Sequence, residues 1–213
     1  MFGIFGFIEV ILHEIPLLYN QLRPLLSFVI GVLAFTILWI FYLSGKGHFW
    51  STLEHELTHA LFAILFLKKV HSISASRRKG GMISIEEGNA VIALSPYIFP
   101  LAPSIILIFL FLLPPPFELS LFFLLGFAYQ FHLINLFEEF HLGQPDLQKA
   151  GIFFSIITIL FFNIVYVGLM ISALDGKSSS FYQFIWDGTA MSLNYMFIFF
   201  SFAMDQLKMI FMR

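Results

Sequence analysis

The chain has 213 residues, of which 59% are hydrophobic and only 11% are charged, and its mean hydropathy is +0.90. This composition excludes an ordinary water-soluble domain and indicates a polytopic membrane protein surrounded by a lipid bilayer. The absence of cysteine excludes disulfides and thiolate metal sites, so any metal must be held by histidine, aspartate or glutamate. No basic tract with interleaved aromatic residues is present, so no nucleic-acid partner is expected.

We predict a single all-α membrane domain over residues 1–213, with five to six transmembrane helices. Polar breaks in residues 1–21 indicate an interfacial or oblique helix. The core of the domain is expected over residues 25–174. Its first span, Leu25 to Leu43, carries no charge and has the roughly 20 residues that a bilayer requires. The second span is predicted from Trp50 to Lys69.

A short β-hairpin is predicted between the second and third secure spans, from Val70 to Glu87. Apolar and polar residues alternate there on both sides of Gly80-Gly81, and a period of two around a Gly-Gly turn is typical of paired strands. The exposed edge of such a hairpin is able to pair with an extended peptide. We therefore predict that Gly80 and Gly81 contribute to substrate binding.

Three further spans and a terminal helix follow the hairpin. The third span, residues 89–113, contains three prolines and is expected to be kinked. The fourth, residues 117–137, becomes polar only at its far end, and the fifth covers residues 147–174. The mixed stretch 181–212 is predicted to be a C-terminal helix, and its composition leaves open whether it spans the membrane, as it does for residues 1–21.

The distribution of basic residues predicts the orientation. If the hairpin is cytoplasmic, nine of the eleven lysines and arginines lie on the inner side, and only Lys46 and Lys177 lie outside. We therefore expect an integral protein of a bacterial cytoplasmic membrane, with the hairpin and the opening of its site toward the cytoplasm.

The sequence His55-Glu56-Leu57-Thr58-His59 lies in the middle of the second predicted span. Histidines four positions apart share one face of a helix and can bind one metal ion, while Glu56 lies beside a water bound to that ion. With Lys68 at the interface and a rise of about 1.5 Å per residue, His59 is expected about 13 Å below the cytoplasmic surface, inside the membrane. Polar groups at such depth are costly unless they are paired, hydrated or metal-bound, which favours a functional role.

These features resemble the site-2 protease family of intramembrane zinc metalloproteases, in particular its small bacterial-type members. The resemblance rests on four features in matching order, over residues 25–174: the HExxH helix, the turn at Gly80-Gly81, the Ser95-Pro96 bend and a later aspartate at a polar break. It implies that Zn²⁺ is bound, that Glu56 is the catalytic general base, and that the substrate is a transmembrane protein cut inside the membrane.

In that family a later aspartate supplies the third metal ligand beside the two histidines. The best match here is Asp146, and Asn135 corresponds to a residue that orients substrate. Two rivals stay open: His132, by its depth, and Asp175, which stands in a literal Leu-Asp-Gly sequence. Simpler roles are a helix N-cap for Asp146 and interhelical hydrogen bonding for Asn135 and His132.

A non-catalytic relative that serves as a membrane scaffold or only binds a metal is the alternative function. Glu56 distinguishes the two, because a site that only binds has no need of a proton acceptor at that position. Membrane di-iron oxygenases use clustered histidines, and the seven histidines of this chain are too few and too scattered for that class.

Overall fold

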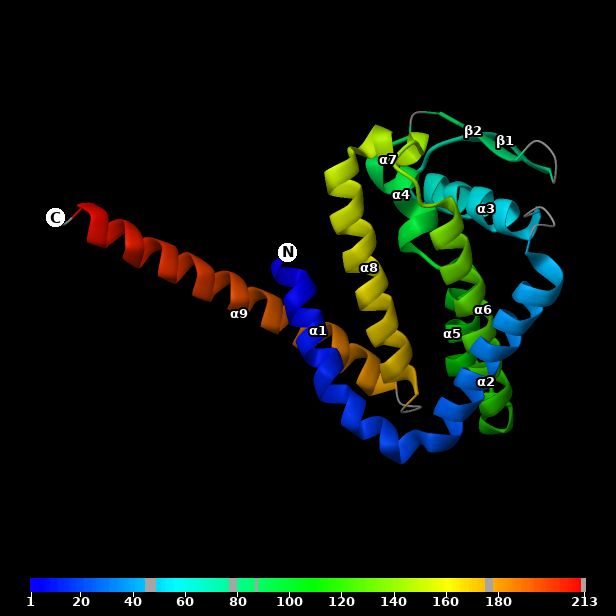
Figure 1. The fold of residues 1–213 in the computed structure, drawn as a ribbon, viewed down its shortest axis with the longest axis horizontal. Helices are drawn as coiled ribbons and strands as arrows, with labels where there is room; N and C mark the ends of the chain where they lie inside the picture. The colour runs from blue at the N-terminus through cyan, green and yellow to red at the C-terminus, as the bar shows by residue number, and fades with distance from the viewer. Residues whose placement is uncertain (45–48, 77–79, 87, 175–177, 212–213) are drawn as a thin grey trace. The chain divides into compact units, whose positions relative to one another are not determined.

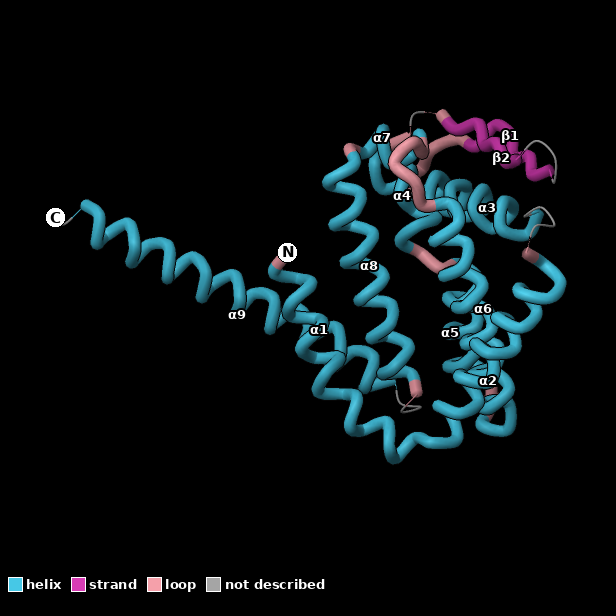
Figure 2. The backbone as a smooth tube through the Cα atoms, viewed as in Figure 1, coloured by secondary structure: helices cyan, strands magenta, loops and turns pink. Residues whose placement is uncertain are grey.

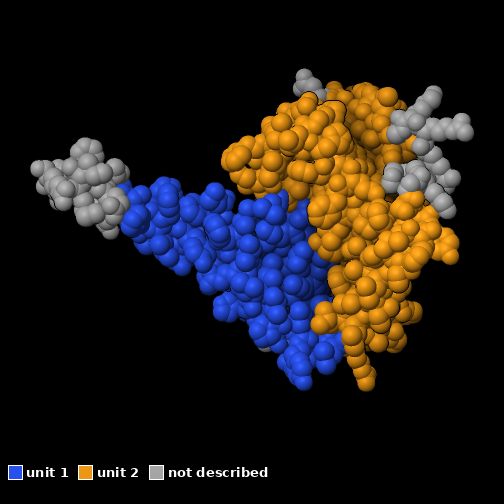
Figure 3. Space-filling view, viewed as in Figure 1, with its two compact units in different colours: residues 1–22, 160–213 blue, residues 23–159 orange. Residues whose placement is uncertain are grey.

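A computed structural model of the chain describes residues 1–44, 49–76, 80–86, 88–174 and 178–211. Regular structure in this part of the chain is helical apart from one two-stranded hairpin (Figure 1). The residues form two compact units, coloured separately in Figure 3: unit 1 comprises residues 1–22 and 160–213, and unit 2 comprises residues 23–159. The expectation of a single domain over residues 1–213 stays a prediction.

Three helical segments are long and apolar enough to cross a membrane: Leu18–Leu43, Pro115–Glu139 and Ile152–Ala173. Helices α4 (Ala90–Ile98) and α5 (Leu101–Leu112) make a fourth candidate if the pair counts as one broken span. The described residues therefore support a helical membrane protein with three to four candidate spans. The larger number of five to six stays a prediction.

Helices α2 (Leu22–Leu38) and α6 (Glu118–Glu139) approach each other closely at two glycines. Gly31 of α2 lies against the main chain at Phe123, and Gly126 of α6 lies against the main chain at Phe28. Small residues on both sides let the two backbones approach closely, as is common between membrane helices. Helix α2 continues into a π-helical turn, Trp39–Leu43, and α6 begins after the short 3₁₀ turn Pro115–Phe117.

The predicted kink of the third span is confirmed as a break between α4 and α5, which are bent by 70°. Asn89 caps α4 by accepting a hydrogen bond from the amide of Ile92 at 2.9 Å. The residue at the cap position of α5 is Pro100, whose side chain offers no acceptor. Glu54, from another helix, instead accepts a hydrogen bond from the amide of Ala102 at 3.1 Å. One of the free amides in the first turn of α5 therefore has an acceptor.

The predicted hairpin is also confirmed. Strands β1 (Val70–Ser76) and β2 (Gly80–Ile85) are antiparallel, with Ser76 opposite Gly80 and Ser74 opposite Met82. The turn residues 77–79 lie outside the described residues. Both strands pack against α3 (Phe49–Leu65), and Figure 2 shows the hairpin lying along this helix.

Helix α3 differs from the predicted second span in length and direction. It has 17 residues, or about 26 Å at 1.5 Å per residue, and it is not among the candidate spans. It ends at Leu65, and Leu67 follows with a φ of 57°, a left-handed conformation that stops a helix. Figure 1 shows α3 crossing the direction of α6 instead of running beside it. The depth of about 13 Å assumed a helix along the membrane normal, and the course of α3 does not support it.

A short helix follows α6, and one glycine separates it from the next long helix, whose residues from 160 onward belong to unit 1. Helix α7 (Pro145–Ala150) packs against α4, and Gly151, with a φ of 91°, divides it from α8 (Ile152–Ala173). The predicted fifth span is therefore two helices, because the positive φ at Gly151 interrupts the helical path.

Unit 1 contains α1 (Phe2–Glu14), a 3₁₀ segment (Ile15–Gln21) and α9 (Ser178–Phe211). Helices α1 and α9 pack together where Gly6 lies against Ser192 and Gly188 lies against the ring of Phe7. The core of this unit consists of Phe7, Val10 and Phe184. The interfacial segment predicted over residues 1–21 is thus an α-helix followed by a tighter turn.

Candidate metal centre

Helix α3 places the two histidines of the HExxH sequence on one face, as predicted. The side chain of His59 is nearly inaccessible, and Glu56 is 7% exposed. The backbone of β2 lies directly over Glu56: a Cβ atom added to Gly81 would collide with the Glu56 carboxylate and with the methyl group of Thr52. Glycine at this position therefore lets the hairpin approach the acidic residue of the motif.

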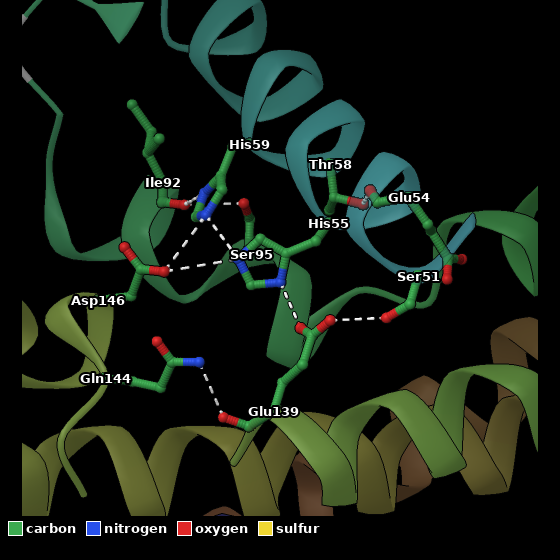
Figure 4. Close-up of polar contacts among 10 residues, drawn as sticks. All are labelled: Ser51, Glu54, His55, Thr58, His59, Ile92, Ser95, Glu139, Gln144 and Asp146. Carbon is green, nitrogen blue, oxygen red and sulfur yellow. Dashed lines mark hydrogen bonds and ion pairs between the residues drawn. The ribbon is translucent and has the colours of Figure 1, made fainter. Parts of the chain in front are cut away.

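The Asp146 carboxylate, from the first turn of α7, completes a group of three potential ligands (Figure 4). Its Oδ2 atom lies 3.5 Å from Nε2 of His55 and 3.4 Å from Nε2 of His59, and the two Nε2 atoms are 3.1 Å apart. The two residues assigned as ligands from the motif and the one assigned by resemblance are thus brought together.

The position of Asp146 is fixed by its neighbour. Leu147 is fully buried in a cluster with Leu94, Tyr97 and Ile98, which anchors α7 against α4. Burial raises the pKa of the Asp146 carboxyl, but the contacts with the two imidazoles lower it by more, so its pKa lies below the usual value. Asp146 is accordingly ionised at neutral pH.

Hydrogen bonds on the far side of each ring indicate the tautomers. Nδ1 of His59 lies 2.7 Å from the carbonyl oxygen of Ile92, and Nδ1 of His55 lies 2.6 Å from Oε2 of Glu139. Both partners accept hydrogen bonds, so each Nδ1 carries the proton. Burial lowers the pKa of His55, but Asp146 and Glu139 raise it by more, to about 9, so at neutral pH its Nε2 carries a proton toward Asp146. A divalent cation that replaced this proton would have both Nε2 atoms and the Asp146 carboxylate as potential ligands.

The spacing of these atoms fits a tetrahedral zinc site. Zinc bonds to nitrogen and oxygen are about 2.0–2.1 Å long, so the edges of the coordination tetrahedron are about 3.3 Å. The observed separations of 3.1, 3.4 and 3.5 Å match one triangular face of such a tetrahedron. Three protein ligands on one face leave the fourth vertex for a water molecule.

The other predicted residues lie nearby but outside this group. Asn135 and His132, both on α6, line a small cavity next to His55, and Asn135 interacts with Glu54. His132 is not one of the three clustered ligands among the described residues. The second rival, Asp175, lies outside the described residues. Gly80 is paired with Ser76 at the start of β2.

Sequence reasoning missed Glu139 and the main-chain carbonyl of Ile92, which orient the two histidines. The sequence does show Glu139 at the polar end of the fourth predicted span. It gives no indication that this residue meets His55, 84 positions earlier. The Ile92 carbonyl cannot be recognised from the sequence, because every residue has a main-chain carbonyl.

No family model, curated protein or solved structure matches the chain. The resemblance to site-2 proteases is thus carried by the chain's own residues alone and stays a prediction.

Proposed function

We propose that this protein is a zinc-dependent intramembrane metalloprotease of the site-2 type. The observation that carries the proposal is the convergence of His55, His59 and Asp146 with the edge lengths of a tetrahedral zinc site. The two histidines lie on α3, the helix that also bears Glu56. A site of this form in a chain of long apolar helices suits hydrolysis of membrane-embedded peptide bonds.

In this proposal the three ligands hold Zn²⁺, which supplies a Lewis acid that lowers the pKa of a coordinated water. Glu56 would accept one proton from the attacking water while the water oxygen forms a bond to the scissile carbonyl carbon. Glu56 then returns the proton to the amide nitrogen as the C–N bond breaks, giving a new carboxyl group and a new amino group. The burial of Glu56 under β2 keeps bulk water from competing for this transfer.

The hairpin suits the binding of an extended substrate. Each strand of β1–β2 has only one partner within the described residues, so a backbone edge is available for pairing with an unwound transmembrane segment. Gly81 brings β2 close to Glu56, which places such a segment near the proposed base. In this proposal the substrate is a single-span membrane protein cut on the cytoplasmic side of a bacterial inner membrane, and Asn135 helps to orient it.

The test compares zinc content and proteolysis in purified wild type, His59→Ala and Glu56→Gln. The probe is a fluorogenic single-span peptide with glycine and proline near one end, in proteoliposomes. We expect one zinc per chain in wild type and Glu56→Gln, none in His59→Ala, and a loss of cleavage of about 10²- to 10⁴-fold in Glu56→Gln. Wild type that binds zinc yet cleaves no member of a panel of such peptides would instead establish the non-catalytic, metal-binding relative.

A further inference from the structure

Glu139, the last residue of α6, uses both oxygens of its carboxylate next to the candidate metal centre. Oε2 accepts a hydrogen bond from Nδ1 of His55 at 2.6 Å, and Oε1 accepts one from the hydroxyl of Ser51 at 2.6 Å (Figure 4). Ser51 lies on α3, one turn before His55, and is buried. The carboxylate is therefore held at both ends by the helix that carries the two histidine ligands.

The main chain of Glu139 makes a further contact with the turn that leads to Asp146. Its carbonyl oxygen accepts a hydrogen bond from Nε2 of Gln144 at 3.0 Å, and Gln144 stands two residues before Asp146. One residue thus contacts His55 directly and braces the segment that presents the third ligand.

The two histidines are oriented by different kinds of acceptor. His59 donates to a neutral carbonyl, that of Ile92, whereas His55 donates to the charged carboxylate of Glu139. A carboxylate acceptor fixes the ring and its tautomer and also makes the opposite nitrogen a stronger electron donor to a metal. Because Glu139 contacts the Nδ1 side of His55, away from the Nε2 atom that faces Asp146, it acts through His55 and is not itself a ligand.

We propose that Glu139 is a positioning residue of the metal centre, which holds His55 in its metal-binding tautomer and orientation and is itself held by Ser51. This inference rests on the proposed zinc site, and it adds a carboxylate–histidine–metal relay that neither the HExxH motif nor the resemblance contains.

The experiment measures zinc affinity by chelator competition and the visible absorption of the Co²⁺-substituted protein, in full-length Glu139→Ala, Glu139→Gln and Ser51→Ala. We expect Glu139→Ala to weaken zinc binding by about 10- to 100-fold and to change the Co²⁺ spectrum. Glu139→Gln retains an acceptor without the charge and should lose less, and Ser51→Ala should lose least. Glu138→Gln is the matched control, because it removes the same charge one residue earlier at an exposed position, and it should match wild type.

Folded Glu139→Ala with wild-type zinc affinity and an unchanged Co²⁺ spectrum would overturn the inference and leave the zinc site itself standing. Should Glu139→Ala fail to fold, wild-type affinity in both Glu139→Gln and Ser51→Ala would overturn it equally. Weakened zinc binding in these variants, in a protein that cleaves no peptide, would support the role of Glu139 and remove only the protease.

Discussion

Both compact units contain histidine and carboxylate side chains among apolar helices, but they arrange them differently. In unit 1 these groups surround an open cavity, lined by polar residues that include His13, Glu14, Asn20, Gln21, Ser172, Gln183 and Asp187. In unit 2, one potential ligand atom from each of His55, His59 and Asp146 lies close to the other two, the one such group found in the part of the chain that the structure describes. The comparison teaches that residue type alone does not bring potential ligands together: hydrogen bonds behind the two histidines and the packing of Leu147 next to Asp146 do so in unit 2.

The largest expected difference between the units is in metal binding after loss of one carboxylate. Asp146→Ala should weaken zinc affinity by more than about 100-fold, because it removes a direct ligand and not merely a group behind one. Glu14→Ala in unit 1 should leave affinity unchanged, because Glu14 accepts a hydrogen bond from Ser172 and belongs to no ligand group in the described part of the chain. Competition titration with a chelator measures both. Equal losses would show that the unit 1 cavity takes part in metal binding.

A smaller effect is expected where glycine allows close packing in each unit. Gly81→Ala would drive a methyl group into Glu56, and Gly6→Ala would drive one into Ser192, so each should destabilise the protein by about 1–3 kcal/mol. Only Gly81→Ala should also slow cleavage, because it displaces the proposed base. Thermal unfolding in detergent and cleavage of the fluorogenic peptide separate the two effects. Slowed cleavage in Gly6→Ala at a temperature where it stays folded would contradict this separation.

The smallest effect concerns a charge at the break between α4 and α5. Glu54→Gln keeps an acceptor for the Ala102 amide but removes the negative charge near the start of α5, which should cost about 0.3–1 kcal/mol. Asp187→Asn removes a charge from the lining of the unit 1 cavity and should change stability by less than about 0.5 kcal/mol. Denaturant unfolding of the two variants beside wild type makes the comparison. A larger loss in Asp187→Asn would reveal a structural role for the unit 1 cavity.

Local patterns predicted much of the fold. The hairpin follows from period-two alternation around Gly80-Gly81, and the bend at α4–α5 follows from closely spaced prolines. The direction of α3 does not follow from its composition, because an apolar segment of this length suits both a membrane span and a helix packed across others. The division at Gly151 was also missed, since a single glycine is tolerated within many helices.

The candidate site divides in the same way. The sequence predicts His55, Glu56 and His59 because one helix sets their spacing, and Asp146 was assigned through the resemblance. The hydrogen-bond acceptors of the two histidines could not be predicted, because the contacts His55–Glu139 and His59–Ile92 join residues far apart in the chain. Such pairs are determined by how α6 and α4 pack against α3, which periodicity does not encode.

Leu147 holds Asp146, the third candidate ligand, in position by packing alone. The Leu147 side chain is buried in the apolar cluster with Leu94, Tyr97 and Ile98. Asp146 therefore belongs to an anchored helix and not to a flexible loop. The candidate ligands are therefore pre-organised, and binding of a metal ion should cost little conformational entropy of the chain. Removal and rebinding of a metal ion should accordingly be reversible while the chain stays folded. A zinc finger, in contrast, unfolds when its zinc is removed.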